Sequence, residues 1–378
     1  MAEATRELPA EAAPGLAPPA ASPWRLALRR LLRKRLAVVA LVLIALFYFV
    51  GLFAPLLAPK DYRDQDLETT LQGPSLEHPL GTDRLGRDQL SRVIWSSRTT
   101  IIITVATVVT GSLVLAVGLG LLSGYLGGAV DTAIMRTGEV FASLPGLPML
   151  ILINATMRDK ARRAVDWLEA HLSTDALGFF VLLAVLGAIA LAALAAWLLA
   201  GEGRRSGGWL GLGFVAAALI LILWSLQGVF ATPGSADYFL IFGALSLFFW
   251  VGGARVIRSQ VLSLRETEYV LAARAMGAST WRILGSHLLP NVSPIIIVGV
   301  SASLGAIAGS EIALTFLGVG VHDPTPSFGA MIFEGASQPV LRNHPHLLLA
   351  PAVVVGLLIF AFNLLGDALN DVLTPKAR

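Results

Sequence analysis

Long uncharged apolar runs recur along this chain and constrain its fold more than any other feature. A helix needs about 20 residues to cross a hydrocarbon core of about 30 Å, and several runs reach that length. The chain is 55% hydrophobic and only 14% charged, whereas soluble domains are about a quarter charged. Each run must be a helix, because the sequence has no alternating β-barrel pattern and lipid tolerates no open strand edge. The predicted fold class is an all-α polytopic membrane protein surrounded by membrane lipid.

Eight runs qualify as spans, and the basic residues between them predict which side each loop faces. Cytoplasmic loops are enriched in Lys and Arg, and a basic cluster from Arg25 to Arg35 precedes the first run. We therefore expect both termini and loop 258–289 in the cytoplasm. The basic residues of segment 158–176 fall on the outer side and do not fit this rule. The runs are 36–57, 99–123, 138–157, 177–200, 208–231, 238–257, 290–318 and 347–366.

The stretch YVLAARAMGASTWRILGSHLLPN at 269–291 is a soluble-looking, lightly basic helical pattern between two spans. Apolar and small residues recur in it at spacings of three and four, which predicts one helical face. Two uses of such a face remain open from the pattern alone: a helix lying on the lipid surface or a helix that another protein contacts. The predicted face contains Val270, Ala273, Gly277, Trp281, Leu284 and Leu288.

A helix–turn–helix arrangement is expected within this stretch. Gly277 predicts the end of the first helix, Ser279 a cap for the second, and Pro290 the first turn of the following span. Ala272, Ala273 and Gly277 would make part of the surface small, so that another protein can approach closely.

The same residues resemble the cytoplasmic EAA loop of permease subunits in ATP-binding-cassette (ABC) importers. In that loop, Glu-Ala-Ala is followed after three residues by Gly, and further on by Leu-Pro. Leu271 stands where the family often has Glu, so we expect no ionic contact at this position. By this resemblance the coupling residues that contact an ATPase subunit are Leu271, Ala272, Ala273, Arg274, Gly277, Leu289 and Pro290.

Five further motifs occur in order with this loop, and together they resemble the C-type permease subunit of dipeptide/oligopeptide (peptide/nickel) ABC importers. The N-terminal tail and residues from about 155 to 236 fall outside the resemblance. It implies an ABC importer type I permease fold with an extra two-helix hairpin, about eight transmembrane helices in all. The motifs are HPLGTDRLGRDQLSRVIWSSRTT (78–100), SGYLGGAVDTAIMR (123–136), HLLPN (287–291), EIALTFLGVGVHDPTPSFGAMI (311–332) and NLLGDALNDVLTP (363–375).

The resemblance also implies partners: a second homologous permease subunit, two ABC ATPase subunits and an extracytoplasmic substrate-binding protein, in a bacterial cytoplasmic membrane. No nucleic-acid partner is expected.

The expected domain organisation has six parts. A disordered, basic cytoplasmic tail at 1–35 comes first, followed by the first span with its outer loop at 36–98 and core helices at 99–157. After these come an inserted amphipathic segment with two extra spans at 158–236, core helices at 237–369 that include loop 258–289, and a cytoplasmic tail at 370–378.

The chain itself is not expected to be an enzyme or to bind a cofactor. It contains no G-x-x-x-x-G-K-[ST] phosphate loop and no Gly-Lys pair, so ATP and Mg²⁺ are expected in the ATPase subunits. It also has no cysteine, which excludes disulfides and thiolate metal sites. The expected substrate is a di- or oligopeptide, with nickel or another small solute as the alternative. A self-sufficient secondary transporter or channel remains the alternative of a different class.

Several polar residues are candidates for further sites or for structural contacts. Glu311 interrupts an uncharged span, and intramembrane acids are often functional, so it is a candidate for the translocation path. Loop 319–335 is a candidate contact for the binding protein, by resemblance. Asp367 and Asp371 are expected to form a polar helix end. Ion pairs that hold a turn are expected of Asp131, Arg136 and Glu139, and no metal-site spacing is found in His78, Asp83 and Asp88.

Overall fold

The computed structural model describes residues 29–171 and 235–373. The predicted spans at 177–200 and 208–231 lie outside these residues, as does the predicted N-terminal tail before residue 29. Within the described ranges every named element is a helix. The predicted all-α fold class is confirmed for this part of the chain.

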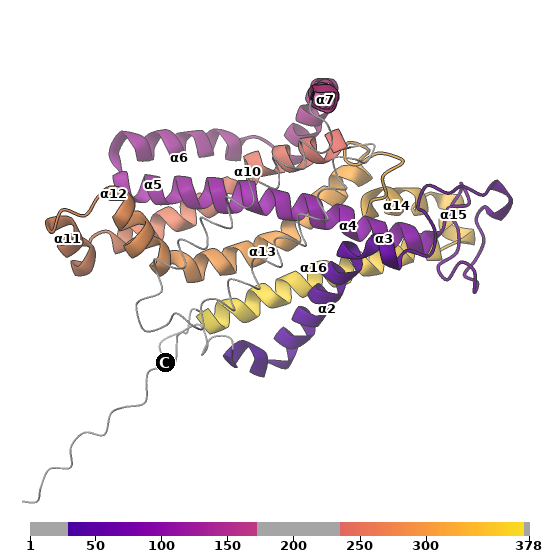
Figure 1. Ribbon diagram of the computed structural model, residues 1–378, viewed down its shortest axis with the longest axis horizontal. Helices are drawn as coiled ribbons and strands as arrows, with labels where there is room; N and C mark the ends of the chain where they lie inside the picture. Colours follow the sequence, from indigo (N-terminus) through magenta and orange to yellow (C-terminus); the bar gives the residue numbers. More distant parts are fainter. Residues whose placement is uncertain (1–28, 172–234, 374–378) are drawn as a thin grey trace, which may run out of the picture.

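Five helical stretches in the described residues are long and apolar enough to cross a membrane, and most run along the long axis of the molecule (Figure 1). They are built from α2 (Arg35–Leu52), α4 (Gln89–Thr107), η2 (Val108–Val117), α5 (Gly118–Leu126), α10 (Ser235–Leu264), α12 (Thr280–Arg282), η3 (Ile283–Leu288), α13 (Leu289–Phe316) and α16 (His346–Leu373). Two stretches are compound, because α4, η2 and α5 follow one another without a break, as do α12, η3 and α13. The predicted number of eight spans is not confirmed.

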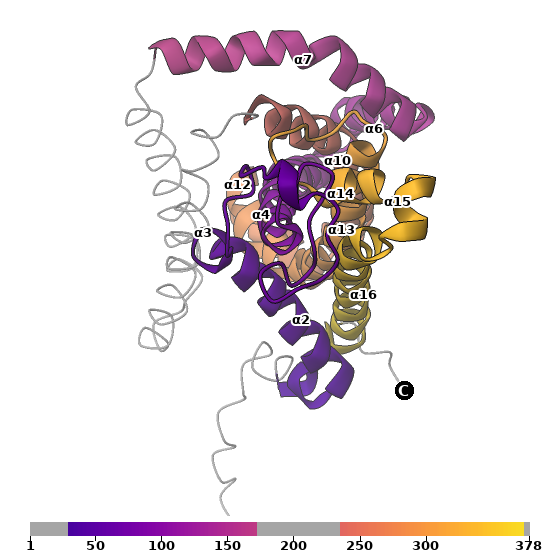
Figure 2. The ribbon, with the colours of Figure 1, turned by 90° about the vertical axis from the view of Figure 1, so that its right-hand side faces the viewer.

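A sharp break interrupts the span predicted at 138–157. Helix α6 (Gly128–Ser143) ends there, and α7 (Gly146–His171) continues at an angle of 91°. The prediction of a single helix is therefore wrong, although the two helices together are long and apolar enough to count as one bent span. Leu144 has an extended backbone, with ψ of 139°, because the residue before a proline is pushed out of the helical region. Beyond the break α7 lies across the other helices rather than along them (Figure 2).

The described helices have two distinct ends. We call the end that carries α11 (Glu268–Ala275) the inner end and the opposite one the outer end (Figure 1). Helices α2 and α16 meet at the inner end, where Lys34 Nζ lies 2.8 Å from Asp371 Oδ2. This grouping agrees with the predicted topology, and it gives Asp371 a structural partner. The outer end holds α3 (Ala54–Leu57), η1 (Leu67–Thr69), α14 (Phe328–Gly335) and α15 (Gln338–Asn343).

Small residues bring α5 and α10 into close contact near the inner end. A Cβ atom built on Gly120 would lie 2.9 Å from the carbonyl oxygen of Ala254, and one built on Gly124 would lie 2.7 Å from Val261 Cβ. Such distances leave no room for a side chain. Gly120 and Gly124 thus serve close helix packing, as small residues commonly do in membrane helices.

Candidate functional site

The segment between α10 and α13 is the best-defined candidate site, and we call residues 265–288 the inner loop. The sequence predicted a loop from residue 258, but α10 continues to Leu264, so its last turns extend beyond the apolar run. The inner loop contains α11, a turn and the short helical elements α12 and η3. The predicted helix–turn–helix is therefore confirmed.

A Schellman motif at Gly277 ends α11. The Gly277 amide donates to the carbonyl oxygen of Arg274, and the Ala278 amide donates to that of Ala273, both at 3.0 Å. Gly277 has a φ of +80°, which glycine adopts without the steric strain imposed by a side chain. Ser279 Oγ then accepts from the Arg282 amide at 3.4 Å and caps the next helix. The predicted helix end and cap are confirmed.

One side of the inner loop packs on the membrane helices. Val270 and Ala273 of α11 are buried, and the predicted exposure of Ala273 is wrong, because its methyl group faces inward. The apolar cluster formed here joins α5, α10, η3 and α13. Its buried members are Leu121, Ile257, Val261, Val270, Ile283, Leu284, Leu288 and Val292.

The other side of the inner loop presents apolar side chains to the surroundings. Met276 is 82% exposed and Trp281 is 74% exposed. The helical pattern put Trp281 on one face with Val270 and Leu284, which is wrong, because Trp281 is exposed whereas the other two are buried. The turn at Gly277 separates the two helices, so their side chains do not form one continuous face. Together with Leu271 and Ala272, these residues form what we call the exposed tip. Arg274 and Pro290 are also exposed, whereas Leu289 is half-buried at the start of α13.

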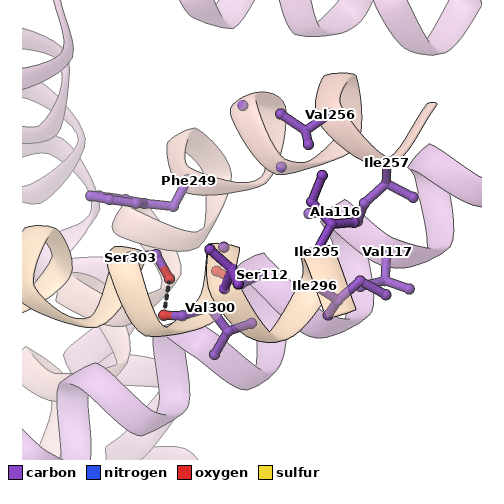
Figure 3. A pocket seen from close by; sticks show the side chains of 14 residues that line it. Ser112, Ala116, Val117, Phe249, Val256, Ile257, Ile295, Ile296, Val300 and Ser303 are labelled. Atoms are coloured by element: carbon purple, nitrogen blue, oxygen red, sulfur yellow. Dashed lines mark hydrogen bonds between the residues drawn. The ribbon is translucent and has the colours of Figure 1, made fainter. Parts of the chain in front are cut away.

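A largely apolar cavity of about 340 Å³ lies between α10, α13 and η2 (Figure 3). Ser112 and Ser303 provide the only polar side chains among its lining residues. Ser303 Oγ donates to the carbonyl oxygen of Val300 at 2.8 Å, so its hydrogen bond is made within its own helix. Three glycines, Gly252, Gly253 and Gly299, keep the walls small.

Glu311 lies elsewhere, in the interior of the subunit. Its side chain is 0% exposed, and it accepts hydrogen bonds from Thr100 at 3.1 Å and from Thr315 at 3.3 Å. It does not line the cavity described above. This geometry joins α13 to α4, and a role for Glu311 in a translocation path stays a prediction.

An ionic cluster at the outer end was not predicted from the sequence. Arg92 Nη1 lies 2.6 Å from Asp83 Oδ2 and 2.7 Å from Glu334 Oε2, and Arg87 Nε lies 2.6 Å from Asp83 Oδ2. Burial alone would lower the pKa of the Arg87 guanidinium, but the carboxylates of Asp83 and Asp323 raise it above its ordinary value. The cluster fastens the loop after α3 to α4 and α14.

Two histidines elsewhere in the described residues form structural contacts with acids. His78 Nδ1 lies 3.0 Å from Asp88 Oδ1, and both side chains are buried. His322 Nδ1 lies 3.2 Å from Asp237 Oδ2. Among the residues that the structure describes, no group of three or more His, Cys, Asp or Glu side chains is arranged to hold a metal ion.

Comparison with known proteins decides the family. Residues 116–378 match the family described as "Binding-protein-dependent transport system inner membrane component". The chain belongs to this family. Residues 22–74 also match the "N-terminal TM domain of oligopeptide transport permease C". The resemblance to C-type permeases is thereby confirmed, and the chain is a multi-pass membrane permease subunit of the ABC importer class.

Named relatives match nearly the whole chain. The dipeptide transport system permease protein DppC of Alkalihalophilus pseudofirmus is 30% identical over 359 residues, covering 95% of this chain and 92% of the relative. The oligopeptide transport system permease protein OppC of Bacillus subtilis is 29% identical over 94% of this chain and 90% of its own length. The glutathione transport system permease protein GsiD of Pectobacterium atrosepticum is 29% identical over 94% and 92%.

Proposed function

We propose that this chain is the C-type permease subunit of an ATP-driven importer of di- or oligopeptides. It would form the translocation path with a second, homologous permease and receive substrate from an extracytoplasmic binding protein. Two ATPase subunits would bind ATP and Mg²⁺ and dock on the inner loop. Because these subunits would lie in the cytoplasm, the inner end would face the cytoplasm. No cofactor is assigned to this chain.

The observation that carries this proposal is the two-sided inner loop. One side is packed into the apolar cluster with α5, α10 and α13, while the exposed tip projects Met276 and Trp281 outward. Exposed large apolar side chains on short helices suit insertion into a groove of another protein. A force applied at the tip would reach the membrane helices through the packed side.

The substrate class is supported by the relatives and by the lining of the cavity. The names printed for the relatives refer to dipeptides, oligopeptides and glutathione, which are all peptides. The cavity residues include serines and small or apolar side chains but no His, Asp or Glu. Ni²⁺ prefers imidazole and other nitrogen or oxygen ligands, so this lining favours a peptide over a bare cation.

Transport by the complex isolated from its native membrane tests the proposal. The complex would be reconstituted in vesicles with ATP on the side of the inner end, and uptake of a radiolabelled dialanine peptide would be followed in the presence of the co-purified binding protein. We expect uptake that requires ATP and persists when ion gradients are collapsed. Uptake by the chain alone, driven by an ion gradient without ATP, would establish a self-sufficient transporter instead.

A further inference from the structure

Two apolar cores that share no residue divide the inner end of the protein. The first is the cluster that joins α5 and α10 to the inner loop. The second joins α2 to α16 through Leu31, Ala37, Ala368 and Val372, and the Lys34–Asp371 ion pair at 2.8 Å reinforces it. Separately packed cores can shift against each other without breaking internal contacts.

Asp131, in the first turn of α6, attaches that helix to the first of these cores. Arg258 of α10 donates from Nε to Oδ1 and from Nη2 to Oδ2, both at 2.5 Å. Ser123 Oγ of α5 donates to Oδ1 at the same distance. A two-point arginine–carboxylate contact fixes orientation as well as distance, so this contact sets how α6 lies against α10.

Two further arginines attach the inner loop to the same place. Arg265 Nη1 donates to the carbonyl oxygen of Gly124 at 3.0 Å. The guanidinium of Arg274 lies 5.3 Å from the centre of the Tyr125 ring, which is within the range of a cation–π interaction. Both contacts fall on the end of α5, immediately before the turn into α6. The loop and the α5–α6 turn are therefore connected by polar contacts in addition to the apolar cluster.

We propose that Asp131 is a positioning residue: through Arg258 it fastens α6 to α10, so that the inner loop, the α5–α6 turn and the inner end of α10 move as one body against α2 and α16. The inference rests on the proposed function, because it describes how a displacement of the inner loop by an ATPase subunit spreads. Val256 and Ile257 of this body line the cavity together with Val300 and Ser303, further along α13, so its movement changes the shape of the cavity.

Distances between spin labels test the single body directly, and the absence of cysteine allows labels to be placed without background. One pair would sit at Thr132→Cys and Glu268→Cys, on exposed positions of α6 and α11, and a second pair at Glu268→Cys and Asp367→Cys. In the complex with its ATPase subunits, we expect the distance distribution of the α6–α11 pair to be narrow and to stay unchanged when ATP is added. The mean distance of the α11–α16 pair should shift. In the Asp131→Asn variant the first distribution should broaden.

Coupling should weaken in the same variant. We expect the dipeptide transported per ATP hydrolysed to fall about tenfold, a typical size for coupling between sites, while the ATPase subunits remain bound. The double variant Asp131→Arg, Arg258→Asp should partly restore the narrow distance distribution of the α6–α11 pair. It should also partly restore the amount of dipeptide transported per ATP hydrolysed. Should Asp131→Asn fail to assemble, Arg258→Lys gives the decisive result, since it keeps the charge and loses the two-point contact.

A matched control lies on the same helix. Arg136 Nη1 and Glu139 Oε2 form an exposed pair at 2.9 Å, and Arg136→Gln should change neither the distance nor the ratio. Unchanged distances and an unchanged ratio in Asp131→Asn and Arg258→Lys would overturn the proposal, as would an ATP-induced shift of the first pair in the unaltered protein. A complete unaltered complex without any ATP-dependent uptake would instead overturn the proposed function.

Discussion

Arg92 of α4 and Glu334 of α14 form a two-point ion pair at the outer end, with Nη1 to Oε2 at 2.7 Å and Nη2 to Oε1 at 3.0 Å. Arg92 is 1% exposed and also contacts Asp83 at 2.6 Å. The pair joins residues that are 242 positions apart in the chain. At the outer end it therefore joins two helices that lie far apart in the sequence.

Replacement of Arg92 should be strongly destabilising. Arg92→Ala removes one of the two cations that Asp83 and Glu334 share and leaves Arg87 as the other. The cost should therefore stay below the about 3–5 kcal/mol of a buried pair that loses its partner altogether. The thermal unfolding midpoint of the detergent-solubilised subunit should drop accordingly. Glu68→Gln, at an exposed position of the same outer loop, serves as the control and should leave the midpoint unchanged. Equal midpoints for the two variants would contradict this account of the cluster.

The positive φ of Gly277 predicts an unusual order among its variants. A built Cβ meets no atom within 4 Å, so any cost comes from the backbone, about 1–3 kcal/mol for a residue other than glycine. Asn tolerates this conformation better than most residues. We expect Gly277→Asn to retain most ATP-driven uptake, and Gly277→Val to lose it. Gly277→Arg should abolish uptake while membrane insertion persists, and unchanged uptake would contradict the coupling role.

Trp281 should contribute strongly to ATPase binding. Truncation of a buried aromatic anchor at an interface commonly costs about 2–4 kcal/mol, so Trp281→Ala should reduce the ATPase subunits recovered with the affinity-tagged permease. Phe360→Ala provides the comparison, since Phe360 is an exposed aromatic on α16, away from the inner loop. Equal recovery from both variants would remove Trp281 from the interface.

Single cysteines should reveal the orientation of the two ends. Met276 and Leu76 are both highly exposed, on the inner loop and the outer loop respectively. A membrane-impermeant maleimide should modify Met276→Cys only in inside-out vesicles and Leu76→Cys only in right-side-out ones. Ala273→Cys, which is buried, should react slowly from either side. The reverse pattern would invert the proposed topology.

Glu311 offers a test of its two possible roles. Gln can accept from one threonine and donate to the other, so Glu311→Gln should preserve both stability and uptake if the side chain only joins α13 to α4. Glu311→Ala should destabilise the subunit by about 2–3 kcal/mol, because it leaves a void and removes the acceptor of the two threonine hydroxyls. A changed rate of uptake in a stable Glu311→Gln variant would favour the translocation path.

Within the inner loop, the features that depend only on neighbouring residues could be predicted from the sequence. Gly277 and Ser279 act within a few residues of their own positions, through φ and capping, and each lies where the sequence places it. Pro290 is the second residue of α13, but η3 runs into α13 without a break, so it does not start a separate helix. The exposure of Trp281 depends on how far the turn rotates the second helix. That rotation is set by packing on α5 and α10, which the helical periodicity does not contain.

The break between α6 and α7 and the outer ionic cluster were missed for different reasons. Pro145 is a local signal for the break, but it lies within the apolar run 138–157, and the hydropathy of a run does not reveal a break inside it. The cluster offered no local signal, because Arg92 and Glu334 become neighbours only when α4 and α14 have packed together. Hydropathy predicts which segments enter the membrane, whereas long-range charge pairing depends on the completed bundle.

The contact between the first and last long helices has a consequence for how the protein is made. Lys34 and Asp371 are separated by 337 residues, and synthesis proceeds at about 5–20 residues per second. On the order of 17–70 s therefore pass between the emergence of α2 from the ribosome and that of its partner. During this interval the face of α2 that packs on α16 is open to lipid and to membrane proteases. A chain cut short before α16 would keep that face open permanently and should be a preferred substrate for degradation.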